Sequence, residues 1–223
     1  MEDEVDRPVR VLVLCGDYWH PPRNAREGLA PLGADDFVFD WIEDAHEWPA
    51  ERMAGYPVIV LAKSNNASSV DRTPWVTPEV ESAFRDYVQR GGGLLVVHSG
   101  SSEYSEAPVL RGLLGGVFAS HPRQCPVTVQ PVAAHPVTAG VDPFTVFDEH
   151  YFMEMDDTGA EVSLTTTSEH GAQPGGWTRT EGEGRVCLLT PGHNLEVWLH
   201  PCYQTLLRNA LRWCCASGLR TEG

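Results

Sequence analysis

The chain alternates short apolar runs with amphipathic segments, and this alternation predicts its secondary structure. An apolar run that is too short for a helix and is bounded by glycine, proline or polar residues is typical of a buried strand. The strands expected on this basis are Pro8–Cys15, Phe37–Ile42, Tyr56–Ala62, Leu94–Val97, Pro126–Val132, Phe144–Met153, Val162–Thr167, Gly176–Thr180 and Arg185–Thr190.

Amphipathic segments lie between these runs. Asn24 and Thr77 are expected N-caps, because such side chains accept hydrogen bonds from the free N–H groups of a first helical turn. The helices expected are Ala25–Leu32, Trp48–Met53, Pro78–Arg90, Glu106–Leu114 and Leu199–Ala216. The order strand, helix, strand predicts an α/β fold with a mostly parallel sheet covered on both faces. We expect one domain over residues 1–223, with residues 1–7 and 217–223 as flexible ends.

This interpretation rests mainly on the stretch GGGLLVVHSG at residues 91–100. Its apolar run predicts a central strand that ends just before His98. In open α/β sheets, ligands bind beyond the carboxyl ends of the strands, so His98 is expected at the mouth of a site. The three glycines precede the strand, whereas a phosphate-binding loop follows one. No nucleotide cofactor is therefore expected.

Two further histidines, His20 and His193, also follow predicted strands, and parallel strands would bring all three to one edge of the sheet. His121 and the acidic pair Asp148–Glu149 could join them from neighbouring loops. Imidazoles with a carboxylate suit a divalent transition metal such as zinc. The same groups could instead act as general acid and base near neutral pH. A third interpretation is that each histidine only bonds to nearby backbone.

Ser99 and Trp19 are expected to contact a ligand. Ser99 follows His98 in a corner that lacks the G-x-S-x-G spacing of a hydrolase elbow, so it is expected to orient a ligand or bond to the loop. Trp19 offers a flat surface on which a sugar could stack.

The six cysteines form no C-x-x-C pair, and Cys15 and Cys187 lie within apolar runs. Free thiols in a reducing compartment are expected.

The amino-acid composition limits the classes of binding partner and the cellular location that we expect for this protein. Hydrophobic residues make up 42% of the 223 residues, which is typical of a globular protein. The formal charge of -15 disfavours nucleic acid. No apolar run approaches the roughly 20 residues that span a bilayer, and the acidic amino terminus is unlike a signal peptide. We therefore expect a cytoplasmic protein with no membrane partner, and its surface-prone aromatic residues are compatible with a homodimer.

Several motifs together resemble the trehalose-utilisation, or ThuA-like, family. These are GGGLLVVHSG at 91–100, LRGLLGG at 110–116, HPVTAGV at 135–141, FDEHYF at 147–152, GWTRTEGEGRVCLLTPGHN at 176–194, HP at 200–201 and LLRNALRW at 206–213. The resemblance implies a flavodoxin-like fold similar to that of class I glutamine amidotransferases, a three-layer sandwich. It also implies a role in carbohydrate metabolism, on trehalose, related disaccharides or their keto forms.

Matched motif by motif, the family's site residues fall on His20, His98, Glu149, Tyr151 and His193. His98 stands where the amidotransferases hold their catalytic cysteine, so glutaminase chemistry is not expected. The leading hypothesis is an enzyme that acts on a sugar or keto-glycoside by metal-assisted or histidine acid/base chemistry.

In this hypothesis each candidate residue has a role. The catalytic residues are His98, His193, Glu149 and Tyr151; the substrate contacts are His20, Ser99, His121 and Trp19; the metal ligands are His20, His98, His193 and Glu149. The alternatives are a non-catalytic amidotransferase-like module that binds a small metabolite or partner protein, and a flavin-binding redox protein.

Overall fold

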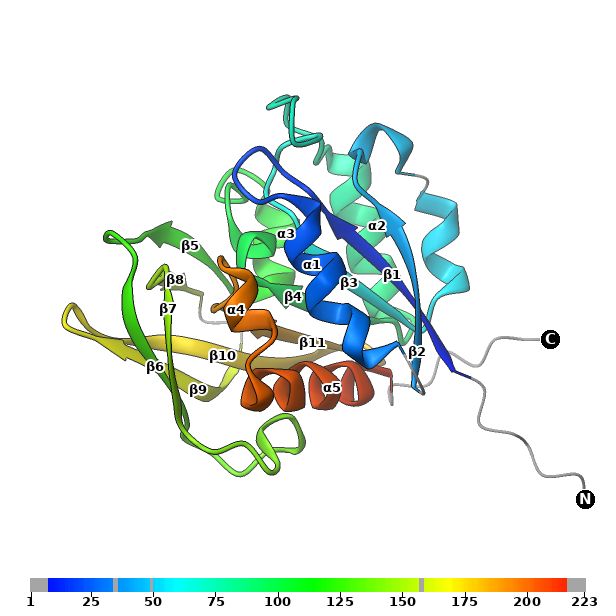
Figure 1. The fold of residues 1–223 in the computed structure, drawn as a ribbon. Helices are drawn as coiled ribbons and strands as arrows, with labels where there is room; N and C mark the ends of the chain where they lie inside the picture. The colour runs from blue at the N-terminus through cyan, green and yellow to red at the C-terminus, as the bar shows by residue number, and fades with distance from the viewer. Residues whose placement is uncertain (1–7, 34–35, 49, 157–158, 216–223) are drawn as a thin grey trace, which may run out of the picture.

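The computed structural model describes residues 8–33, 36–48, 50–156 and 159–215. Its main sheet has the strand order β2-β1-β3-β4-β11-β10-β9-β6-β7 (Figure 1). The parallel half comprises β1 (Val9–Cys15), β2 (Phe37–Ile42), β3 (Val58–Ala62), β4 (Gly93–Val97) and β11 (Gly184–Leu189). The antiparallel half comprises β10 (Gly171–Glu181), β9 (Glu161–Ser168), β6 (Cys125–Pro131) and β7 (Phe144–Asp148).

The central parallel strands are apolar on both faces because each face meets its own core. In β1, for example, Val11 and Val13 pack into one apolar cluster, whereas Leu12 and Leu14 pack into the other. Side chains alternate between the faces of a strand, so a continuous apolar run is what a two-sided strand requires. This two-sided burial fixes the register and the direction in which each strand end points.

Helices cover both faces of the sheet and make three layers (Figure 1). One layer contains α1 (Pro22–Leu29), α4 (Leu195–Trp198) and α5 (Pro201–Cys215), and the other contains α2 (Pro78–Gln89) and α3 (Pro108–Leu114). The 3-10 segments are η1 (Ala30–Leu32), η2 (Ala45–Glu47), η3 (Ala50–Gly55), η4 (His98–Ser101) and η5 (Pro136–Thr138). No helix in the described residues is long and apolar enough to cross a membrane.

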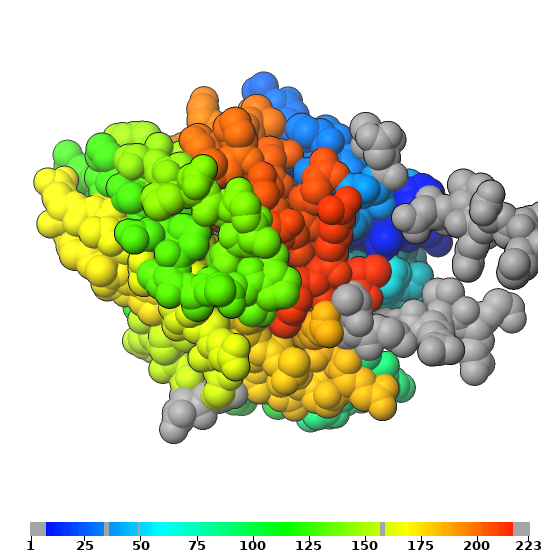
Figure 2. Space-filling view, turned by 90° about the horizontal axis from the view of Figure 1, so that it is seen from below, coloured from blue at the N-terminus to red at the C-terminus, as the bar shows by residue number. Residues whose placement is uncertain are grey.

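Helix α5 joins distant parts of the chain. Seen from below, it lies between the green segment that contains η5 and the blue amino-terminal elements (Figure 2). The Asn209 amide donates to the carbonyl oxygens of Val137 at 3.2 Å and Ala139 at 2.9 Å. These bonds hold the loop between β6 and β7 against the helix layer.

The sequence prediction of an α/β fold is confirmed, with a mixed sheet that is parallel in one half and antiparallel in the other, but several helix predictions need correction. Helix α1 begins at Pro22 rather than after Asn24, since proline suits the first helical turn, where its missing N–H is not needed. Helix α3 likewise begins at Pro108. Residues 195–215 form two helices, because Pro201 starts a new one. Thr77 does cap α2, accepting a hydrogen bond from the N–H of Val80 at 3.4 Å.

One strand prediction needs correction and one strand was not predicted, and both differences bear on the site. The single strand expected at Phe144–Met153 is two strands, β7 and β8 (Phe152–Met155), which belong to different sheets. Strand β8 pairs with β5 (Gly116–Ser120), which the sequence did not predict. The short helix expected at Trp48–Met53 is the 3-10 helix η3, whose bounds are Ala50–Gly55. The expected flexible ends, 1–7 and 217–223, lie outside the described residues.

Candidate metal centre

Four side chains meet at the carboxyl end of the parallel strands. His20 follows β1, His98 follows β4, His193 follows β11, and Glu149 follows β7. One donor atom from each lies within 4.8 Å of the donor atoms of the others. The three histidines converge because their strands are parallel members of one sheet, whereas Glu149 comes from its antiparallel half.

Hydrogen bonds on the outer side of two rings determine which nitrogen faces the cluster. His98 Nδ1 lies 2.8 Å from the carbonyl oxygen of Thr190, and since a carbonyl only accepts, Nδ1 carries the proton. His20 Nδ1 lies 2.8 Å from the Asp17 carboxylate. In the neutral rings both Nε2 atoms therefore present a lone pair to the cluster. Outer partners of this kind orient metal-binding histidines in proteins.

The inner ring nitrogens lack ordinary partners. His20 Nε2, His98 Nε2 and His193 Nδ1 are buried and form no hydrogen bond with the described residues. Glu149 Oε2 comes within 3.4 Å of His98 Nε2 and 3.1 Å of His193 Nδ1, without hydrogen-bond alignment. Buried polar atoms are normally satisfied, so this convergence marks a place where a further group can bind.

Asp148 is fully buried and holds the loop that carries His193. Its carboxylate accepts hydrogen bonds from the N–H groups of Gly192 at 2.8 Å, His193 at 3.0 Å and Asn194 at 3.4 Å. From the other side, the Asn24 amide donates to the His193 carbonyl at 2.7 Å. The end of β7 is thereby tied to the loop after β11, which brings the next residue, Glu149, to the histidines.

Burial and neighbouring charges shift the pKa values of the cluster in opposite directions. Burial lowers the pKa of His98. Burial also lowers the pKa of His193, but the adjacent Glu149 carboxylate raises it by more. Burial opposes ionisation of Glu149, yet the His193 and His98 rings hold its pKa well below the usual range. In the same way, the His20 ring overcomes burial and lowers the pKa of Asp17 to about 2. Such a site attracts a cation.

The turn after β4 is tight and strained. His98 has a φ of +47°, in the left-handed region that residues other than glycine rarely adopt. A Cβ on Gly100 would lie 1.9 Å from the carbonyl oxygen of Leu61, so only glycine fits there. The Tyr151 ring stacks on His98 with ring centroids 4.0 Å apart. Packing from both sides therefore holds the strained backbone and aims the imidazole at the cluster.

A cavity of about 270 Å³ opens onto the cluster. The residues that line it are Trp19, His20, Ser102, Glu103, Phe118, His121, Glu149, Tyr151 and His193. Trp19 is exposed, and His121 Nε2 lies 3.6 Å from Glu149 Oε1. Ser99 is not among the lining residues: it is buried in η4, where its carbonyl accepts from the Ser102 N–H at 2.9 Å.

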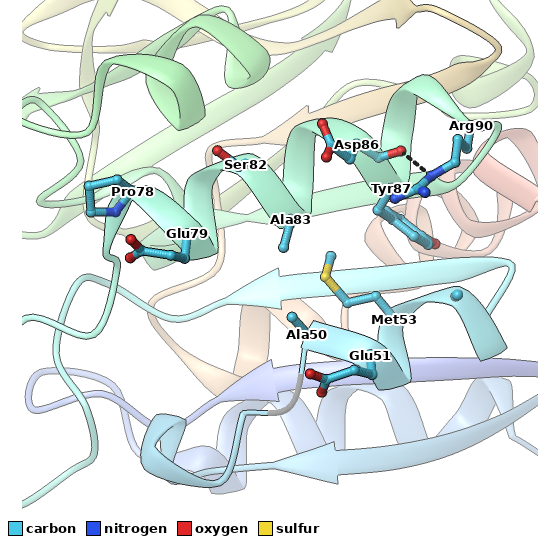
Figure 3. Close-up of a pocket in the computed structure, with 11 residues that line it drawn as sticks. Ala50, Glu51, Met53, Pro78, Glu79, Ser82, Ala83, Asp86, Tyr87 and Arg90 are labelled. Atoms are coloured by element: carbon cyan, nitrogen blue, oxygen red, sulfur yellow. Dashed lines mark hydrogen bonds between the residues drawn. The ribbon is translucent and has the colours of Figure 1, made fainter.

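A larger cavity, of about 690 Å³, lies between η3 and α2 (Figure 3). Met53, Ala83 and Tyr87 face one another across it, and Glu51, Glu79, Asp86 and Arg90 bring charge to its edges. None of the described residues that line it is a histidine or a cysteine. The smaller cavity at the cluster is therefore the candidate site.

Sequence reasoning did not single out four residues of this region: Asp17, Ser102, Glu103 and Phe118. Asp17 had a usable signal, because a carboxylate three residues before a histidine in one loop is well placed to orient its ring. Phe118 lies on β5, which the apolar pattern did not predict. Ser102 and Glu103 lie in a polar turn with no distinguishing pattern.

The fold and the cluster define a class: a flavodoxin-like α/β protein with a histidine–carboxylate site at the edge of its parallel strands. Residues 10–214 match the family model described as trehalose utilisation, ThuA. The chain therefore belongs to the ThuA family. No curated protein matches it by sequence.

Solved structures agree with this assignment. A ThuA-like protein from Bacteroides uniformis is 22% identical, with a TM-score of 0.72 over 95% of this chain and 94% of that one. A ThuA-like protein from Parabacteroides merdae is 17% identical, with a TM-score of 0.76 over 97% and 93%. A cytoplasmic protein from Salmonella typhimurium is 17% identical, with a TM-score of 0.72 over 92% and 99%. At such identities the likeness establishes the fold.

Proposed function

We propose that this chain is a metal-dependent enzyme of carbohydrate metabolism, in which His20, His98, His193 and Glu149 bind a divalent transition metal such as zinc. One observation carries the proposal: three buried imidazole nitrogens, which have no hydrogen-bond partners among the described residues, converge with a carboxylate. Leaving buried polar atoms unpaired is costly, and a metal ion would pair with all of them. The donor set of three nitrogens and an oxygen suits borderline ions.

The proposed substrate is a sugar or a keto-glycoside. Aromatic faces of Trp19, Phe118 and Tyr151 line the cavity beside the polar groups of Glu103 and His121. Apolar faces with a few polar groups are typical of small-molecule sites and suit a sugar ring, which is apolar on its faces and polar at its edges. The family description, trehalose utilisation, is consistent with this class. A cytoplasmic location is part of the proposal, since one structural relative is described as cytoplasmic.

The side chains of this site would bind, orient and exchange protons. When bound, a divalent ion would polarise a carbonyl or activate a water. Burial raises the pKa of Tyr151 well above its usual value, so its hydroxyl stays protonated and can donate to a substrate oxygen. Ser102 Oγ lies 3.4 Å from that hydroxyl and helps to position it. His121, at the rim, is placed to contact the substrate.

Elemental analysis of the purified protein, after incubation with Zn, Mn or Ni, tests the metal site. We expect about one equivalent of metal per chain, as in mononuclear sites, and none in a His98→Ala, His193→Ala double variant that keeps its circular dichroism spectrum. A His46→Ala, His170→Ala double variant is the matched control, because it removes two histidines outside the cluster. A parent protein that binds no metal contradicts the proposal.

The enzymatic part needs a separate measurement. Sugars and their keto derivatives are incubated with the metal-loaded protein, and product formation is followed. Turnover that is lost in His98→Ala supports the assignment, whereas normal turnover in that variant contradicts it. Saturable binding without product would favour the alternative of a non-catalytic binding module.

A further inference from the structure

The chain has a single lysine, and its side chain is buried. Lys63 follows β3, and every other basic side chain apart from the histidines is an arginine. Its exposed fraction is 0%. Lysine is almost never fully buried unless its charge is paired. We therefore expect this ammonium group to have a specific partner.

The Lys63 side chain joins the ends of three neighbouring strands. Its Nζ atom donates to the carbonyl oxygen of Gly16, just after β1, at 2.5 Å and to that of Glu43, just after β2, at 3.0 Å. The strand order β2-β1-β3 places β1 between the other two. Gly16 has a φ of +78°, in the left-handed region that glycine adopts in tight turns. The ammonium group thus holds the turn that leads into Asp17.

The residue after Lys63 holds the Asp17 carboxylate directly. The Ser64 N–H donates to Asp17 Oδ2 at 2.9 Å, and Asp17 Oδ1 lies 2.8 Å from His20 Nδ1. The Lys63 carbonyl oxygen accepts from the Tyr104 hydroxyl at 2.6 Å, which fixes the backbone of this segment. A connected path therefore runs from Lys63 through Asp17 to the ring of His20.

The charges of Lys63 and Asp17 offset each other. Asp17 is 1% exposed, and a buried charge is costly unless an opposite charge or hydrogen bonds compensate it. Burial lowers the pKa of Lys63, and the Asp17 carboxylate is the first of the charges that oppose this shift. The interaction is mutual, so the ammonium group also favours the ionised carboxylate. Lysine places its charge on one compact group, whereas the guanidinium of arginine is planar and extended.

We propose that Lys63 is a positioning residue of the metal centre: it holds the turn and the charge of Asp17, and through Asp17 it orients the ring of His20. This inference rests on the proposed function, in which His20 binds the metal. Lys63 is not among the residues that line the cavity at the cluster. It therefore does not touch the substrate and acts only through its neighbours.

Chelator competition for zinc tests this role. Lys63→Met removes the charge from a side chain of similar length, and we expect it to weaken zinc binding by about 3–10-fold, less than the loss of a carboxylate bonded directly to a ligand ring. In the Asp17→Asn background the same substitution should weaken binding by less than about twofold, because its effect passes through Asp17. A lysine that only stabilises the fold would not show this dependence.

Arg179→Met is the matched control. The Arg179 side chain on β10 is 9% exposed and donates to the Gly112 carbonyl and to Glu181, so this variant removes another largely buried cation, outside the cluster. Its zinc affinity should equal that of the parent. The inference is overturned by an equal loss in Arg179→Met, by parent-like affinity in Lys63→Met, or by an undiminished loss in the Asp17→Asn background. Each of these results leaves the proposed function standing, whereas a parent protein that binds no zinc overturns both.

A second measurement decides the question if Lys63→Met does not fold. Because Lys63 is the only lysine, isotope-labelled lysine gives the parent protein one set of lysine side-chain NMR signals. Zinc binding at the cluster should shift these signals through His20 and Asp17. Signals that stay unchanged while zinc binds overturn the positioning role.

Discussion

Replacing Asp148 by Asn should destabilise the protein and loosen the loop that carries His193. One carboxylate oxygen accepts from Gly192 and the other accepts from His193 and Asn194. Asparagine has only one acceptor oxygen, so its NH₂ group must face an N–H on one side. A buried donor left unpaired costs about 1–3 kcal/mol, and more beside a second donor. We expect the free energy of unfolding to fall by about 2–3 kcal/mol, where the lower limit allows for relaxation of the loop.

A chain of this length loses about 2–4 °C in Tm for each kcal/mol, so a decrease of roughly 4–12 °C is expected in thermal unfolding. Urea unfolding gives the free energy directly, and a chelator is added to both measurements because bound metal stabilises the folded state. Asp142→Asn is the control: Asp142 is exposed, and its replacement should change stability by less than about 0.5 kcal/mol.

The opposite result for Asp148→Asn would refute this reasoning in an informative way. Burial raises the pKa of the Asp148 carboxyl, which shows that its charge is costly to bury. If the variant is as stable as the parent or more stable, that cost exceeds the value of the hydrogen bonds to the loop. Asp148 would then be kept for its effect on His193 and not for stability, and the metal content of the variant would show that effect.

Two further predictions concern residues around the cluster. Asp17→Asn should weaken metal binding by about 10–100-fold in chelator competition, because Asp17 orients the ring of His20, a proposed ligand, whereas Asp44→Asn, in an exposed carboxylate–histidine pair, should have no effect. Gly100→Ala should lower the free energy of unfolding by about 1–3 kcal/mol, because its Cβ would overlap the Leu61 carbonyl. Gly112→Ala, with open space around the new Cβ, should not destabilise, and equal stability of the two glycine variants contradicts the argument.

The sequence was sufficient to predict that the histidines would meet. The runs Val11–Cys15, Leu94–Val97 and Val186–Leu189, which precede His20, His98 and His193, are apolar. Such runs indicate parallel strands with both faces buried, and parallel strands end at the same edge. No knowledge of the intervening loops was needed. The gathering of these residues is a consequence of topology.

The environment of Glu149 and Tyr151 could not be predicted in the same way. The run from Phe144 to Met153 has no glycine or proline to interrupt it, so local pattern favours one strand. The break arises from distant partners: Asp148 bonds to the loop after β11, and β8 pairs with β5. Such contacts are nonlocal, and they do not change the hydrophobic periodicity of the segment. The same is true of the bond from Asn66 to Glu103, which joins loops after two different strands.

The turn at His98 links the fold to the proposed chemistry. In α/β enzymes, a sharp and strained turn after a central strand holds a nucleophile clear of the sheet. Here the same kind of turn, with positive φ at its first residue and no room for a side chain at Gly100, presents an imidazole. Cys15 and Cys187 lie inside strands, and burial raises the pKa of each thiol to about 12, so neither can replace a nucleophile at this corner. A strained turn that holds no nucleophile can instead position a metal ligand or a proton carrier. The Nε2 atom of His98, which has no hydrogen-bond partner among the described residues, is suited to either role.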